Sequence, residues 1–170
     1  MLLTIFLAIV FCTAMALLYL SAVMFIQNEK MFSSAPKEVQ EVIQPREAEL
    51  FRGARAMGWT LMALSIVIVL GVGVISIWDG LRNDFTFVQF FTRFVIIFTA
   101  YKVCDMILVD YFLLLKSRFF QHFYPEVESV FPPKKYGFNL KSQLLKLIVV
   151  FPAACALAAW VCTLIRGITI

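Results

Sequence analysis

Four charged side chains interrupt the apolar stretch between residues 87 and 115, and the last three carry most of the chemistry that this sequence offers. Lys102, Asp105 and Asp110 lie among phenylalanine, isoleucine and leucine residues. Ionisable residues at membrane depth are costly when they face lipid, so they usually turn inward and mark ion or substrate pathways. Lys102 and Asp105 are three residues apart, which makes them neighbours on a helix and predicts an ion pair.

The helical wheel groups these residues with further polar side chains. At about 100° per residue, one arc of roughly 140° contains Thr99, Lys102, Asp105 and Asp110. Arg93 points to another side, and Tyr101 flanks the arc as a hydrogen-bond donor. Three hypotheses follow: an ion pair that only stabilises the bundle, an ion or proton pathway, and a pocket for a polar small molecule or lipid headgroup.

A second set of polar residues follows this stretch. His122 and Glu126 belong to an aromatic segment, and Lys134 and Lys135 follow two prolines. Aromatic residues that leave a span are typical of the interfacial belt. Lysines at the inner leaflet can meet anionic lipid headgroups. The alternative hypothesis is catalysis on a lipid-like substrate by His122, Glu126 or Asp110, with the catalytic roles unknown.

Cofactor and metal chemistry find no support in the sequence. The single histidine excludes a haem held by two histidines of one protomer and zinc sites built from histidine pairs. The motifs of nucleotide-binding loops, serine hydrolases and zinc proteases do not occur. Buried packing is the default for the four cysteines, which are Cys12, Cys104, Cys155 and Cys162. We therefore predict no cofactor and no metal site.

The composition indicates which kind of structure holds these residues in place. Of 170 residues, 62% are hydrophobic and 15% are charged, which lies outside the range of water-soluble domains. Charged residues are absent from 1–28, 56–78 and 147–165. A helix needs about 20 apolar residues to cross the hydrocarbon core. A soluble enzyme, a disordered chain, a secreted disulfide scaffold and a nucleic-acid-binding domain are excluded, despite a net charge of +4.

We predict an all-α polytopic membrane protein with one membrane domain over residues 1–170, folded as a four-transmembrane-helix bundle. The predicted spans are 2–26, 57–78, 87–115 and 144–165. The third is included because leaving it outside would place the apolar runs 94–98 and 106–109 in water.

The first long loop, residues 27–56, is predicted to contain two short interfacial helices. Each starts at a proline, at 36–44 and at 45–55, because proline suits the first helical turn. The second is expected to extend the following span as a charged stalk.

Small residues suggest where helices approach closely. Pro152 predicts a kink in the last span, and Ala154 and Ala158 belong to a small-residue run. Gly71 and Gly73 give the second span a comparable thin region. Because four helices bury only a modest core, we expect a homo-oligomer.

Lysine and arginine counts predict the orientation. The loops 27–56 and 116–143 are rich in both residues, whereas the opposite side holds few. The positive-inside rule therefore makes both loops cytoplasmic and places both termini outside the plasma (inner) membrane.

The sequence thus predicts a small membrane protein that binds or conducts a small polar species, an ion or a proton through the Lys102, Asp105 and Asp110 cluster. The alternatives are an interfacial membrane enzyme and an accessory subunit of a larger membrane complex. The expected partners are the bilayer, anionic headgroups and a second copy of the chain, with no nucleic acid.

The predicted orientation can be tested by cysteine labelling. A membrane-impermeant thiol reagent should label a cysteine placed at Asn83 from outside. It should label one placed at Ser129 only after permeabilisation. The reverse labelling pattern would contradict the orientation.

Overall fold

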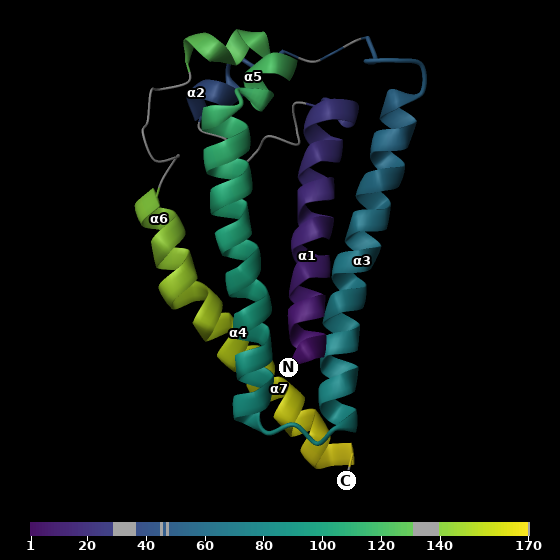
Figure 1. The fold of residues 1–170 in the computed structure, drawn as a ribbon, viewed down its shortest axis with the longest axis vertical. Coiled ribbons are helices and arrows are strands. Elements are labelled where there is room, and N and C mark those ends of the chain that lie inside the picture. The colour runs from purple at the N-terminus through teal and green to yellow at the C-terminus, as the bar shows by residue number, and fades with distance from the viewer. Residues whose placement is uncertain (29–36, 45, 47, 131–139, 170) are drawn as a thin grey trace.

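The computed structural model describes residues 1–28, 37–44, 46, 48–130 and 140–169. All regular structure in these ranges is helical, as the sequence predicts. Long helices alternate in direction, short helices gather at one end, and both termini lie toward the other end (Figure 1). The end with the short helices is called the capped end below.

Within the described residues, three helices are long and apolar enough to cross a membrane, and they indicate that the protein is integrated in one. They cover Leu2–Ile26, Ala54–Arg82 and Ser142–Gly167. The first consists of α1 (Leu2–Leu20) and the π-helical turn η1 (Ser21–Ile26), in agreement with the predicted span 2–26. The second is α3 (Ala54–Arg82), which extends beyond the predicted span at both ends.

The remaining long helix carries Lys102, Asp105 and Asp110. It consists of α4 (Phe87–Cys104) and the π-helical segment η3 (Asp105–Lys116), which continue one another. Its start agrees with the predicted residue 87, because Thr86 and Gln89 form a reciprocal capping box. The Thr86 hydroxyl accepts from the Gln89 N–H at 3.4 Å, and Gln89 Oε1 accepts from the Thr86 N–H at 2.8 Å.

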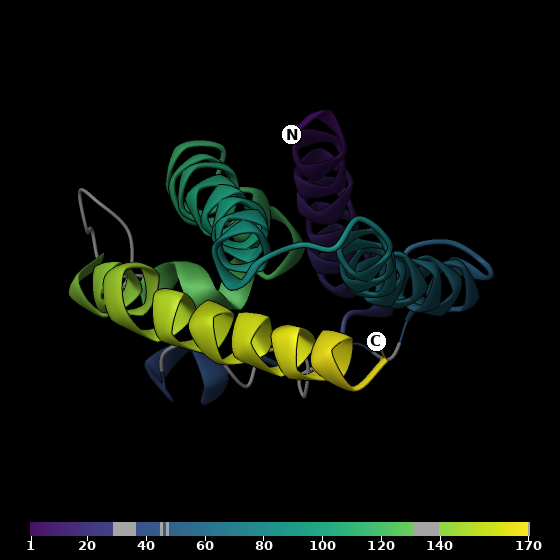
Figure 2. The same ribbon diagram turned by 90° about the horizontal axis from the view of Figure 1, so that it is seen from below.

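Helix α1 lies between α3 and α4, and α7 (Phe151–Thr169) packs against α4 from another side. Viewed along the bundle, α7 crosses the other helices obliquely (Figure 2). Leu7, Phe11, Val72 and Ile97 form the apolar contact of α1 with α3 and α4.

Close helix contact on α3 occurs at other glycines than expected. A Cβ atom on Gly58 would lie 2.7 Å from Cβ of Phe25, and one on Gly80 would overlap the ring of Phe90. Gly71 and Gly73 have no atom within 4 Å of such a Cβ, so they form no close helix contact within the chain, and a contact between protomers stays a prediction.

The last span begins earlier than predicted. Helix α6 (Leu140–Leu145), the π-helical turn η5 (Lys146–Val150) and α7 form one run. The π turn immediately precedes Pro152. Proline lacks an N–H and its ring crowds the preceding turn, so a local widening relieves the clash. A π turn thus precedes Pro152, and the predicted kink in this span stays a prediction.

The loop helices differ from the prediction. In the first loop, α2 covers only Lys37–Gln40, and the helix expected at 45–55 is wrong, because the described residues 46 and 48–53 are not helical. Gly53 has a left-handed φ of 89°, and its N–H donates to the Glu49 side chain at 2.7 Å. These features start α3 at Ala54. The second loop contains α5 (Phe119–Phe123) and the 3₁₀ turn η4 (Pro125–Ser129), which we did not predict.

Candidate functional site

The expected ion pair between Lys102 and Asp105 is present near the middle of its helix. Lys102 Nζ lies 2.6 Å from Asp105 Oδ2, and the two side chains are 8% and 23% exposed. Lys102 is thus almost fully withdrawn, while the carboxylate keeps a partly open side. A charge-assisted bond of this length satisfies the ammonium group in surroundings where an unpaired charge would be costly.

Asp105 lines a cavity of about 230 Å³. A water molecule occupies about 30 Å³ in the liquid, so this space suits a small solute or ion with a few waters. Its wall comes from α1 and η1, from α3 through Met62, and from α4 and η3. Tyr19 and Tyr101 add polar hydroxyl groups to a lining that is otherwise mostly apolar and sulfur-containing.

An apolar layer lies at each end of this cavity. Toward the termini, Phe11 packs edge-on against Phe98 and Tyr101, with ring centroids 5.7 and 5.4 Å apart. Toward the capped end, a cluster of buried side chains closes the bundle, comprising Val23, Val39, Ile43, Phe120, Tyr124 and Val127. The cavity, called the chamber below, therefore lies between two apolar clusters and is itself partly open.

The polar face predicted from the helical wheel applies only as far as Asp105. The wheel assumes α-helical turns, but the backbone changes to π-helical hydrogen bonding at Asp105, so the assumed phase is wrong beyond that residue. Thr99 is half-buried and is not among the residues that line the cavity. The side chain of Asp110 lies outside the described part of the structure. Tyr101 lines the cavity.

Sequence reasoning missed a second buried charge cluster, centred on Arg93. Arg93 Nη2 lies 2.7 Å from Asp79 Oδ2, and the Arg93 side chain is only 4% exposed. Its Nε donates to the Thr4 hydroxyl at 3.2 Å, and its Nη1 donates to the Ser76 carbonyl at 3.0 Å. One guanidinium thereby joins α1, α3 and α4.

A signal for this cluster exists in the sequence. Asp79 and Arg93 have opposite charges and flank the short connection between two antiparallel helices, so they come to similar depth. The guanidinium also lies over the Phe85 ring at 4.3 Å, within that connection. A helical wheel compares Arg93 only with residues of its own helix, so it does not identify Asp79 as the partner.

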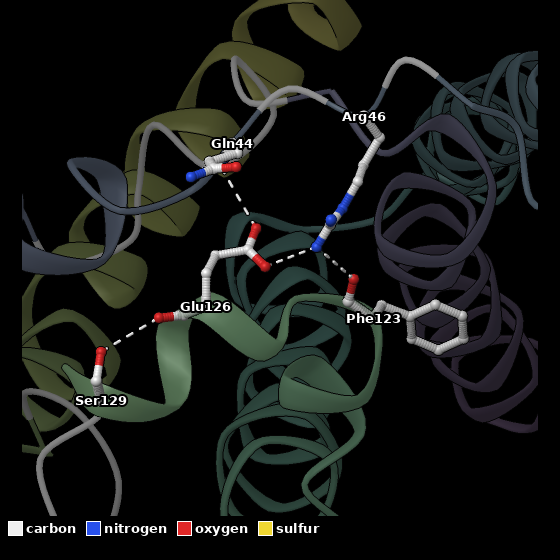
Figure 3. Close-up of polar contacts among 5 residues, drawn as sticks. All are labelled: Gln44, Arg46, Phe123, Glu126 and Ser129. Atoms are coloured by element: carbon white, nitrogen blue, oxygen red, sulfur yellow. Dashed lines mark hydrogen bonds and ion pairs between the residues drawn. The ribbon is translucent and has the colours of Figure 1, made fainter.

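The interfacial candidate Glu126 has a structural partner at the capped end (Figure 3). Glu126 Oε2 lies 2.6 Å from Arg46 Nη2, which also donates to the Phe123 carbonyl at 3.2 Å. The Gln44 N–H donates to Glu126 Oε1 at 3.4 Å. The Arg46 carbonyl in turn accepts from Arg55 of α3. The carboxylate thus connects the first loop to η4.

Tyr124 lies beneath this ion pair and is fully buried. Arg46 stands 5.4 Å from the centre of its ring. Burial raises the pKa of the Tyr124 hydroxyl, and the nearby Arg46 charge offsets only part of the effect. The residue therefore stays neutral and serves as packing.

The other interfacial candidates form no common site in the described structure. His122 is exposed and its ring lies edge-on to Phe123 at 5.2 Å. Lys134 and Lys135 lie outside the described residues. Within the described ranges, no group of three or more histidine, cysteine, aspartate and glutamate side chains is arranged to hold a metal ion.

Comparisons with protein-family models, with curated protein sequences and with solved structures find no significant match to this chain. Its function therefore has to be inferred from the site itself.

The Arg93 cluster yields a stability prediction. Arg93→Lys should lower the free energy of unfolding by about 1–3 kcal/mol, because an ammonium group cannot reach Thr4, Ser76 and Asp79 together. Unfolding in detergent, followed by circular dichroism, measures the change. The control is Arg82→Lys on the exposed side of α3, where we expect a change within about 0.5 kcal/mol. Equal effects of the two substitutions would contradict the assigned role of Arg93.

Proposed function

We propose that this protein binds a small ion or polar species in the chamber beside Asp105 and passes it across the membrane. The observation that carries the proposal is the partly open carboxylate of a buried ion pair on the wall of a cavity of about 230 Å³. Ionisable residues in such positions usually serve a pathway or a ligand. The start of a π-helical segment at Asp105 adds support, because π-helical turns are frequent at functional sites.

The proposal includes a fourth membrane span formed by α4 and η3. Helices α3 and α7 run in the same direction (Figure 1), so the chain has to cross the membrane between them if both are spans. The outward side chains of α4 and η3 fit a lipid environment, since many exposed ones are large and apolar, including Val88, Val103, Ile107 and Phe112. The cations Arg93 and Lys102 are turned inward and buried.

We further propose that the capped end faces the cytoplasm and that the protein resides in the plasma (inner) membrane. The loops of this end carry most lysine and arginine residues of the connecting segments. Lys116 and Lys146 are exposed near this end, where anionic headgroups of the inner leaflet would attract them.

A second copy of the chain is the partner that we propose. Ala154 and Ala158 of α7 are exposed, while Cys155 and Ala159 pack inside against α4. Small residues on an outward face permit close helix contact between protomers. Light scattering in mild detergent should show a dimer or larger assembly that Ala154→Leu with Ala158→Leu dissociates. A monomeric wild type would contradict the proposal.

The function of the ion pair can be separated from its contribution to stability. Lys102→Met should lower the free energy of unfolding by about 3 kcal/mol, because it leaves Asp105 without its partner. Removing one partner of a buried ion pair usually costs about 3–5 kcal/mol of stability. The low end of this range applies here because the Asp105 side chain is 23% exposed. Lys102→Met with Asp105→Leu should recover most of the stability. Proton and monovalent-cation flux into vesicles that contain the folded double variant should be lost.

The matched control is the exposed pair of Arg118 and Glu128, whose side chains are 74% and 62% exposed. Arg118→Met with Glu128→Leu removes the same charges and should leave flux unchanged. A folded Lys102→Met, Asp105→Leu protein with full flux would show that the pair is only structural. Wild-type vesicles with no more flux than protein-free vesicles would contradict passage.

A further inference from the structure

The residues that line the chamber beside Asp105 include four with sulfur-containing side chains, from three helices. Cys12 and Met15 come from α1, Met62 from α3 and Cys104 from α4. The Cys12 and Cys104 thiols are also near enough to interact with each other. These residues are far apart in the sequence, so only the folding of the bundle collects them around one space.

The other two cysteines have different surroundings. Cys155 and Cys162 are buried in the contact of α7 with α4, packed against Phe90 and Phe94. Neither lines the chamber. They pack as small apolar side chains, and they provide an internal reference for the pair in the chamber.

Thiol and thioether sulfurs form a particular class of metal ligand. Cysteine and methionine are soft donors that favour Cu(I), whereas carboxylates and carbonyls suit magnesium, calcium and manganese. Structural zinc sites need four ligands in tetrahedral arrangement, usually cysteine and histidine. The chamber offers two thiols, two thioethers and one carboxylate, and that carboxylate already pairs with Lys102. This set suits a soft ion of low coordination number.

We infer that the chamber binds a soft monovalent metal ion, Cu(I), between the sulfur atoms of Cys12 and Cys104, with Met15 or Met62 as a thioether ligand. The inference rests on the proposed function, because it names the class of ion that the same chamber takes.

The chamber can hold Cu(I) without a net charge. Cu(I) brings one positive charge, and the loss of one proton from Cys12 or Cys104 to water supplies one negative charge. The second thiol and the thioether bind as neutral ligands. The ion pair of Lys102 and Asp105 is neutral as a unit, so the occupied chamber carries no net charge. A divalent ion would be neutral only with both thiols deprotonated, so the thioether ligands, which favour Cu(I), decide between the two kinds of ion.

The experiment uses the full chain in detergent under anaerobic, reducing conditions. Cu(I) is supplied as a complex with a chromophoric Cu(I) chelator, and absorbance reports how much the protein withdraws. We expect one Cu(I) per chain. Cys12→Ala and Cys104→Ala should each weaken binding by at least about tenfold, since removing even an outer partner of a metal site costs that much. Met15→Leu, which conserves volume, should weaken it without disturbing the fold.

The matched controls are Cys155→Ala and Cys162→Ala, which should bind Cu(I) like the wild type. Alkylation gives a second readout: Cu(I) should protect Cys12 and Cys104 from a membrane-permeant maleimide and leave the other two cysteines unchanged. Substoichiometric binding, or equal losses in the Cys12 and Cys155 variants, would overturn the inference as adventitious thiol binding.

Failure of this inference is distinguishable from failure of the proposed function. Flux that depends on Asp105 together with no Cu(I) binding would overturn the metal site alone. Cu(I) binding that depends on Cys12 and Cys104 without any flux would support the metal site and overturn passage.

Discussion

Two cations on α4 need partners inside the bundle, and this requirement determines how the other helices meet. A charge that faces lipid is costly, and removing one member of a buried pair leaves the other uncompensated. Arg93 is matched by Asp79 of α3, by Thr4 of α1 and by the Ser76 carbonyl. Because a guanidinium donates in several fixed directions, it holds three helices in one register. Lys102 is matched on its own helix by Asp105.

Because their partners differ, Arg93 and Lys102 constrain the bundle in different ways. Arg93 is enclosed and cross-links helices, so its neighbourhood has little freedom to change. The Lys102 pair is local, and Asp105 keeps an open side on the chamber wall. The helix also changes from α to π geometry at this residue. The Arg93 cluster toward the termini is therefore more constrained by its contacts than the segment beside the chamber, and the proposed function depends on the latter.

The capped end is held together differently from the Arg93 cluster. Its buried cluster combines side chains of η1, α2, α5 and η4 with the residues just beyond α2. The ion pair of Arg46 and Glu126 lies over Tyr124 and is 30% and 16% exposed. It is reached by water more easily than the Arg93 cluster.

Hydropathy and charge patterning alone determined the helical class, the limits of the first span, the start of α4 and the pairing of Lys102 with Asp105. These features are local, since apolar runs, a capping box and a three-residue spacing act within one segment. The tertiary structure decided that Arg93 pairs with Asp79, that Glu126 binds Arg46, and that Gly58 rather than Gly71 is a contact point within the chain. It also gathered Cys12, Met62 and Cys104 around one chamber. Such contacts depend on the relative rotation and depth of separate helices, which the periodicity of a single helix does not specify.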